Sequence, residues 1–238
     1  MAQNAGNAKN ILVGASPLFI SNLDVTTSGY VENAEPGTAA AGAFASGTSY
    51  TDTLNAITPG STFAYRNVGF TNNGLQITYN PTYDSVTVDQ LLDTAKLFKS
   101  AMEVMIMTEM SEGTLENVLV VFGQSDDPTS NTISNSNTLI ESGSGATATK
   151  TLGLAAGALG IAPTERQLIA VGQAPTASAT RTERVYYARR VLSVQQSQFT
   201  LARSTPTTFP VTFRLLPTAM SGYEGQEYGK IIDRVLAV

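Results

Sequence analysis

The chain alternates between short apolar stretches and long polar ones, which is typical of β-rich proteins. Apolar and β-branched residues gather in runs of strand length that are bounded by Asn, Gly or Pro. We expect strands at 17–21, 63–70, 75–79, 150–155, 166–172, 183–195, 198–203 and 207–216, with an extended stretch through Val86 and Val88.

Two short motifs predict where the first of these strands break. Asn72-Asn73-Gly74 predicts a hairpin turn, because Asn and Gly tolerate a positive φ. Asn80-Pro81 predicts the end of the following strand. Residues 101–110 fit either a helix or a strand; as a strand, one face would carry Met102, Val104, Ile106, Thr108 and Met110.

The clearest helical pattern covers residues 112–122. Apolar residues from Leu115 to Phe122 follow the spacing i, i+3, i+4, i+7. Ser111 is the candidate N-cap, and Gly123 is placed to close the helix.

Polar segments separate these elements and predict long loop arms. We expect a flexible N-terminal arm at 1–16, a long loop at 32–62, a polar loop at 124–149, and a polar tail from Gly222 that ends in a short apolar element. The whole chain, 1–238, then forms a single domain that is mainly β (α+β). Its expected architecture is a β-sandwich or partly closed β-barrel with one flanking α-helix.

The composition suggests a chain that hides surface in an assembly. Charged residues make up only 14% of the 238 residues, against about 25% in a typical domain. Residues 1–119 hold four basic and eleven acidic groups, net −7, and residues 120–238 hold ten basic and eight acidic groups, net +2. Such asymmetry suits head-to-tail contact between copies, although solvated surface charge gives the same pattern. The overall net charge of −5 argues against wrapping nucleic acid.

Missing residue types limit the chemistry of the chain. It has no His and no Cys, which removes His-based triads, imidazole general bases, thiolate chemistry and disulfides. We find no phosphate-binding glycine motif, no signal peptide and no apolar run long enough for a membrane span. The adjacent pair Asp126-Asp127 lies in a polar loop, which favours a solvated turn over a catalytic or cation-binding pair. We therefore expect no catalytic, cofactor-binding or metal-binding residues and no enzyme activity.

One segment, residues 68–119, resembles the major tail tube proteins of long-tailed, siphovirus-type bacteriophages. The similarity lies in the order and spacing of Val68-Gly69-Phe70-Thr71, Gly74, Tyr79-Asn80-Pro81-Thr82-Tyr83, Val86-Thr87-Val88-Asp89-Gln90 and Thr114-Leu115-Glu116-Asn117. The C-terminal part is also similar, through Arg189-Arg190, the stretch from Phe209 to Leu216, and the stretch from Gly225 to Asp233. The motif positions are Gly69, Gly74, Asn80, Pro81, Val88, Asp89, Gln90, Leu115, Glu116 and Asn117.

The resemblance implies a structural virion protein that is assembled in the host cytoplasm. Hexameric rings would stack helically into a hollow tube, with strands of neighbouring subunits joined into one barrel around the lumen. A long loop or hairpin and the terminal arms would reach the next ring. Tape-measure, tail terminator and tail tip proteins would be its other partners, and DNA would pass through the lumen without specific binding.

A conduit for DNA needs a lumen that repels phosphates. The candidate lumen-facing residues are therefore the acidic ones between 82 and 116: Asp84, Asp89, Asp93, Glu103 and Glu109, followed by Glu112 and Glu116. For any one of them, an outer-surface or interface position fits equally well.

Three alternatives remain open. The chain could be a surface-displayed β-sandwich that serves as a binding or adhesion module, although it has no Trp and no aromatic-rich patch. It could be a tube subunit of a phage-related secretion or gene-transfer particle. A carboxylate-dependent hydrolase is the remaining enzymatic option, and it is disfavoured because the chain lacks His.

Overall fold

The computed structural model describes residues 14, 16–21, 65–89, 93–124, 139–142, 149–154, 163–175, 182–194, 198–201, 203–204, 206–218 and 222–236. The described elements are β1 (Leu18–Ser21), β2 (Tyr65–Asn67), β3 (Thr71–Thr87), β4 (Thr94–Met110), α2 (Leu115–Val121), β5 (Leu139–Ser142), β6 (Thr149–Leu152), β7 (Arg166–Gln173), β8 (Thr182–Ser193), β9 (Phe209–Leu215) and β10 (Gly229–Val235). The expected loop 32–62 and Asp126-Asp127 lie outside the described residues, as does most of the expected arm 1–16.

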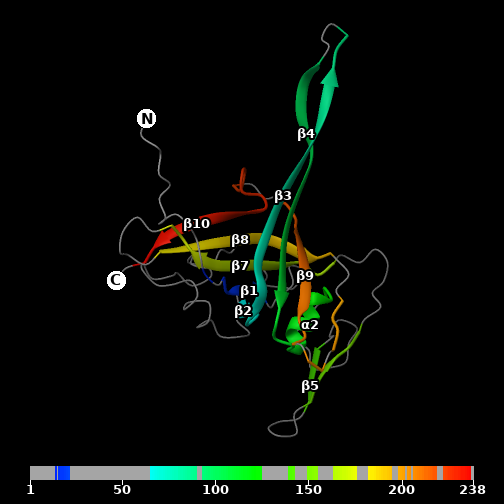
Figure 1. Cartoon of the computed structure of the whole chain (residues 1–238), viewed down its shortest axis with the longest axis vertical. Coiled ribbons are helices and arrows are strands. Elements are labelled where there is room, and N and C mark those ends of the chain that lie inside the picture. Colours follow the sequence, from blue (N-terminus) through cyan, green and yellow to red (C-terminus); the bar gives the residue numbers. More distant parts are fainter. Residues whose placement is uncertain are drawn as a thin grey trace.

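Eight strands form one antiparallel sheet in the order β2-β1-β7-β8-β9-β4-β3, with β10 also paired to β8. β8 is shared: its residues Thr182–Ala188 pair with β10, and Val191–Ser193 pair with β9. At this fork the sheet changes direction, so that β9, β4 and β3 run across β7, β8 and β10 (Figure 1). The sheet is not closed into a barrel, and a mainly β, sandwich-like class is confirmed.

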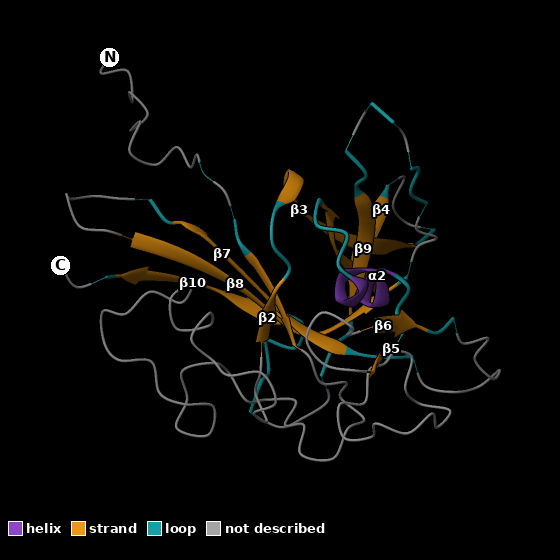
Figure 2. Cartoon of the chain, turned by 90° about the horizontal axis from the view of Figure 1, so that it is seen from below, coloured by secondary structure: helices purple, strands orange, loops and turns teal. Residues whose placement is uncertain are grey.

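The main core lies where the two directions of the sheet meet. Leu119, Val120 and Val121 of α2 pack there against apolar residues of both parts of the sheet, among them Leu168 and Phe213. Figure 2 shows α2 beside β9 and the small β5–β6 hairpin. A second buried cluster, which includes Phe19, Ile169 and Tyr187, lies among β1, β2, β7 and β8.

Residues 101–110 form a strand, the second half of β4. The face expected for a strand is confirmed, because Val104, Ile106, Thr108 and Met110 are all buried. The helix is shorter than predicted and begins at Leu115, since Thr114 rather than Ser111 is the N-cap and accepts a hydrogen bond from the Asn117 N–H. Gly123 closes the helix as expected, with φ of 65°.

Two predicted breaks in the early strands are wrong. Asn73 and Gly74 do have positive φ values, 60° and 68°, but they form a bulge inside β3, where the register with β4 shifts, instead of a hairpin turn. β3 also continues through Pro81, which pairs with Met102. A proline is tolerated there because β3 is the last strand of the sheet, so its missing N–H need not serve a ladder.

Three further boundaries differ from the predictions. The described residues of 198–203 form no strand; instead Phe199 packs its ring 4.8 Å from that of Phe209. The predicted loop 124–149 contains β5, which pairs with β6. The apolar element expected in the tail is β10, while the strand expected at 63–70 is reduced, among the described residues, to the three residues of β2.

Candidate functional site

β3 and β4 extend beyond the rest of the sheet as a two-stranded arm. β9 pairs with β4 only from Met105 to Met110, whereas β4 pairs with β3 from Thr94 onward. We call residues 79–89 and 93–103 the arm. It rises from the sheet along the longest axis of the molecule (Figure 1). Within the part of the chain that the structure describes, no strand pairs with the outer edge of β3.

The arm exposes large apolar side chains on both faces. Tyr79, Tyr83 and Leu97 share the face that α2 covers in the body, and they are 65%, 57% and 63% exposed. Val86 and Phe98 lie on the opposite face and are also exposed. An isolated two-stranded ribbon is marginally stable in water, so side chains of this kind indicate a contact surface.

The face of the ribbon opposite α2 brings three of the candidate acidic residues together. Asp84, Glu103 and Glu109 alternate with the core-facing residues and therefore share this face. Glu103 lies 3.7 Å from Arg214 of β9. The other two candidates, Asp89 and Asp93, flank the end of the arm, where Asp93 Oδ1 accepts a hydrogen bond from the Thr94 N–H.

Glu112 and Glu116 lie at the other end of the ribbon and have local partners. Glu112 Oε1 accepts a hydrogen bond from the Phe70 N–H at 3.0 Å, and Glu116 binds Lys150 of β6 at 2.8 Å. Partial burial acts to raise the pKa of Glu116, but hydrogen bonds and the charges of Lys150 and Arg66 outweigh it and leave this pKa below its ordinary value. These two carboxylates hold the base of the ribbon and do not belong to the acidic face.

Two of the motif positions named in the sequence analysis, Gly69 and Asn117, meet at this base. The Asn117 side chain donates to Val68 O at 2.9 Å and to Glu112 O at 2.8 Å, while its Oδ1 accepts from Arg66 at 2.6 Å. Gly69 has φ of 84°, and its missing Cβ leaves room for the Glu112 carboxylate. The motif residues Gly69 and Asn117 therefore form a structural joint between β2, β3 and α2.

At the joint, the buried Arg66 guanidinium lies near the carboxylates of Glu116 and Glu112. Burial lowers the pKa of Arg66, and the charges of Glu116 and Glu112 act in the opposite direction. Phe70, the neighbour of Gly69, projects from the joint and is 78% exposed. The turn is rigidly held, because Phe70 O also accepts from the Ser111 N–H at 2.8 Å.

The remaining motif positions do not gather at one site. Gly74 lies in the bulge, Asn80 and Pro81 lie along β3, and Val88 and Asp89 lie at the end of the arm. Leu115 and Glu116 begin α2, and Gln90 lies outside the described residues. The positions before α2 are therefore spread along the ribbon from the bulge to the end of the arm, whereas Leu115 and Glu116 belong to the helix.

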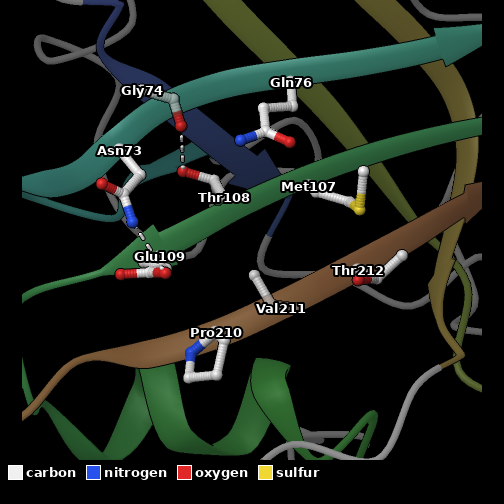
Figure 3. Close-up of a pocket in the computed structure, with 9 residues that line it drawn as sticks. All are labelled: Asn73, Gly74, Gln76, Met107, Thr108, Glu109, Pro210, Val211 and Thr212. Atoms are coloured by element: carbon white, nitrogen blue, oxygen red, sulfur yellow. Dashed lines mark hydrogen bonds between the residues drawn. The ribbon is translucent and has the colours of Figure 1, made fainter.

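A small hollow of about 210 Å³ lies beside the bulge on the acidic face, between β3, β4 and β9. Figure 3 shows Thr108 donating to Gly74 O and Asn73 donating to Glu109, over 3.0 and 2.9 Å. Among the described residues that line the hollow, Glu109 is the one titratable group, so they do not supply the carboxylate pair used in glycoside hydrolysis. Among the described residues, no three His, Cys, Asp or Glu side chains are grouped to hold a metal ion.

Sequence reasoning missed the apolar side chains of the arm. The available signal is the presence of large apolar and aromatic residues in this otherwise polar stretch, namely Tyr79, Tyr83, Leu97 and Phe98. No described helix has the length and apolar character needed to cross a membrane. No protein-family model matches the chain, and no curated protein matches its sequence.

Proposed function

We propose that this chain is a structural subunit of a bacteriophage tail tube, which forms hexameric rings that stack into a hollow conduit for DNA. The observation that carries the proposal is the β3–β4 ribbon, whose outer edge pairs with no described strand and whose apolar side chains are exposed. An exposed strand edge promotes aggregation unless another strand covers it. Pairing with identical copies covers each edge with main-chain hydrogen bonds and closes a ring.

The charge on the ribbon supports a conduit for nucleic acid. Three carboxylates, those of Asp84, Glu103 and Glu109, lie on the face opposite α2 and outnumber its two nearby cations, Lys96 and Arg214. A surface of net negative charge repels DNA phosphates and lets the duplex slide past. We propose that this face lines the lumen, and that α2 lies on the outer side.

The joint at the base of the ribbon supports the resemblance to tail tube proteins. Its hydrogen bonds tie the turn after β2 to the start of α2 and so fix the direction in which the ribbon leaves the body. Subunits of a regular tube need such a fixed direction, because every copy must present its edges in the same geometry.

Electron microscopy of the purified protein tests the proposal. A concentration series imaged by negative stain, with sedimentation velocity in parallel, should show sixfold rings at intermediate concentration and stacked tubes at high concentration. A protein that stays monomeric at all concentrations and salt conditions contradicts the proposal and favours the binding module. A resolved tube whose inner wall is lined by arginine contradicts the assignment of the acidic face to the lumen.

A further inference from the structure

Arg189 and Arg190 lie at the fork where β8 exchanges β10 for β9 as its partner. Both residues oppose the single residue Gln167 of β7, because the register between β7 and β8 shifts there by one residue. This arrangement is a β-bulge, which bends a strand and increases its twist. The bulge therefore accounts for the change in direction of the sheet at the fork (Figure 1).

Arg190 holds one end of the segment that joins β9 to β10. We call the described part of residues 216–228 the connector. The Arg190 guanidinium donates to Pro217 O at 3.2 Å, and Arg190 O accepts from the Leu216 N–H at 2.9 Å. Two hydrogen bonds to the Glu165 carboxylate, at 2.6 and 2.9 Å, hold this guanidinium in place. The beginning of the connector is thus tied to the second residue of the bulge.

Arg189 holds the other end of the connector. Its side chain is the largest fully buried one among the described residues, and the residue is 0% exposed. Arg189 Nε donates to Gln226 O at 3.1 Å, and the Arg189 N–H donates to Tyr228 O at 3.2 Å. The guanidinium also lies 3.8 Å from the centre of the Tyr223 ring, a cation–π contact that is stronger where water is excluded. A buried charge needs such partners, and here the connector supplies several of them.

The connector also lies near the arm. Its two ends meet, because the Thr218 N–H donates to Glu227 O at 3.0 Å. The pKa of the Glu227 carboxyl lies below its ordinary value, chiefly because the Gly225 N–H donates to it at 2.8 Å, and the charge of Lys99 in the arm acts in the same direction. The connector is therefore held at the fork and faces the arm through Glu227.

Backbone pairing alone holds the two directions of the sheet together weakly. β9 pairs with β8 over only three residues, Val191–Ser193. The core beneath α2 spans the bend, but apolar burial has no preferred direction. Hydrogen bonds do have one. The contacts of the two arginines are therefore suited to define the angle of the bend.

We infer that Arg189 and Arg190 clamp the connector and so fix the angle at which β9, β4 and β3 cross β7, β8 and β10 in the free subunit. This angle sets the direction of the arm. Without the clamp, the part of the sheet that carries the arm tilts over a range of angles. A fixed arm lowers the entropy cost of any contact that the arm makes. The inference does not depend on the proposed function, because a single copy contains the whole clamp.

Pulsed electron paramagnetic resonance tests the clamp at a concentration where sedimentation shows monomers. Spin labels are attached to Leu97→Cys in the arm and to Gln173→Cys at the exposed end of β7, since the chain has no other Cys. The clamped protein should give a single narrow distance distribution. Arg189→Met and Tyr223→Ala should each replace this narrow peak with a broad distribution. Tyr223→Phe keeps the ring over the guanidinium and should retain the narrow peak.

The matched control is Arg184→Met, which removes another arginine of β8. Arg184 binds Asp233 of β10 at 2.6 Å and holds no part of the connector through that pair, so the narrow peak should remain. Tyr223 is only half-buried, so its variants decide the matter even if Arg189→Met does not fold. A broad distribution before any clamp variant, an unchanged peak in Tyr223→Ala, or equal broadening by Arg184→Met overturns the clamp and leaves the proposed function standing. A protein with the narrow peak that never forms rings overturns the proposed function and leaves the clamp.

Discussion

The two halves of β4 show the same alternation of residues but opposite exposure. In the body, Val104 and Ile106 are 6% and 3% exposed, because they lie in the main core, which also contains residues of α2 and β9. In the arm, Leu97 is 63% exposed although it continues the same face. One half of this strand thus contributes to the core of its own chain, and the other half exposes its apolar residues.

The two halves of the ribbon are stabilised by different contacts. The body half is fixed by burial and by the joint around Asn117, whereas the backbone of the arm half pairs with β3 and with no other described strand. Such a ribbon is marginal by itself. Its apolar side chains gain their full stabilisation only when another surface covers them.

The largest effect on stability is expected from truncation in the body half of β4. Ile106→Ala should lower the free energy of unfolding by about 2–5 kcal/mol, because it leaves a cavity in the main core. Leu97→Ala, on the same face but in the arm, should change it by less than about 0.5 kcal/mol. Urea unfolding of dilute protein measures both, and equal losses would contradict the division of β4 into two halves.

A smaller loss is expected at the joint. Asn117→Ala should cost about 1–3 kcal/mol, because it leaves buried groups, among them the Arg66 guanidinium and Val68 O, without this partner. The control is Asn72→Ala on the exposed part of β3, which should stay within about 0.5 kcal/mol. If the two variants unfold alike, the joint does not anchor the ribbon.

The ion pair between β6 and α2 should contribute less still. Lys150→Met removes the Lys150–Glu116 pair and should cost under about 1 kcal/mol at neutral pH, because Lys150 is 44% exposed. The pKa of Glu116 is lowered in the folded state, so the contribution is complete above its ordinary pKa of 4.5 and is lost as the pH falls through the lower folded value. Unfolding curves of both proteins should therefore converge at acidic pH; a difference that persists unchanged would contradict this assignment.

The smallest effect on stability should come from removing the arm itself. Residues 83–100 are replaced by Asn-Gly, which joins the paired residues Thr82 and Ala101 through a tight turn. The thermal midpoint of the monomer should stay nearly unchanged while rings and tubes disappear from negative-stain images. Normal assembly of the shortened chain would show that the arm is not a contact.

Local sequence rules predicted some elements because the responsible residues act over a few positions. Gly123 closes α2 as expected, and the strand face of residues 101–110 was readable from its alternation. The same rules failed at Asn73-Gly74, where the positive φ values were right but the chain makes a bulge. A bulge and a turn use the same local conformation, and only the distant partner β4 decides between them.

The candidate site could be predicted only in part. The acidic residues were noticed, and three of the five share a face, but Glu112 was grouped with them although it holds the Gly69 turn. The arm was missed because its existence depends on where β9 ends relative to β4, which no local pattern encodes. The start of α2 was also misplaced, because Ser111 and Thr114 are both suitable N-cap residues and lie one turn apart. The structure uses Thr114.

Pro81 has a consequence for newly made chains. It divides the outer edge of β3 into two short stretches, since a proline offers no hydrogen to a strand laid beside it. A non-native strand that pairs with this edge cannot continue its hydrogen bonding past Pro81. Pro81 therefore disfavours aggregation through pairing in the wrong register. A partner strand that needs no hydrogen bond at this position can still pair with the edge.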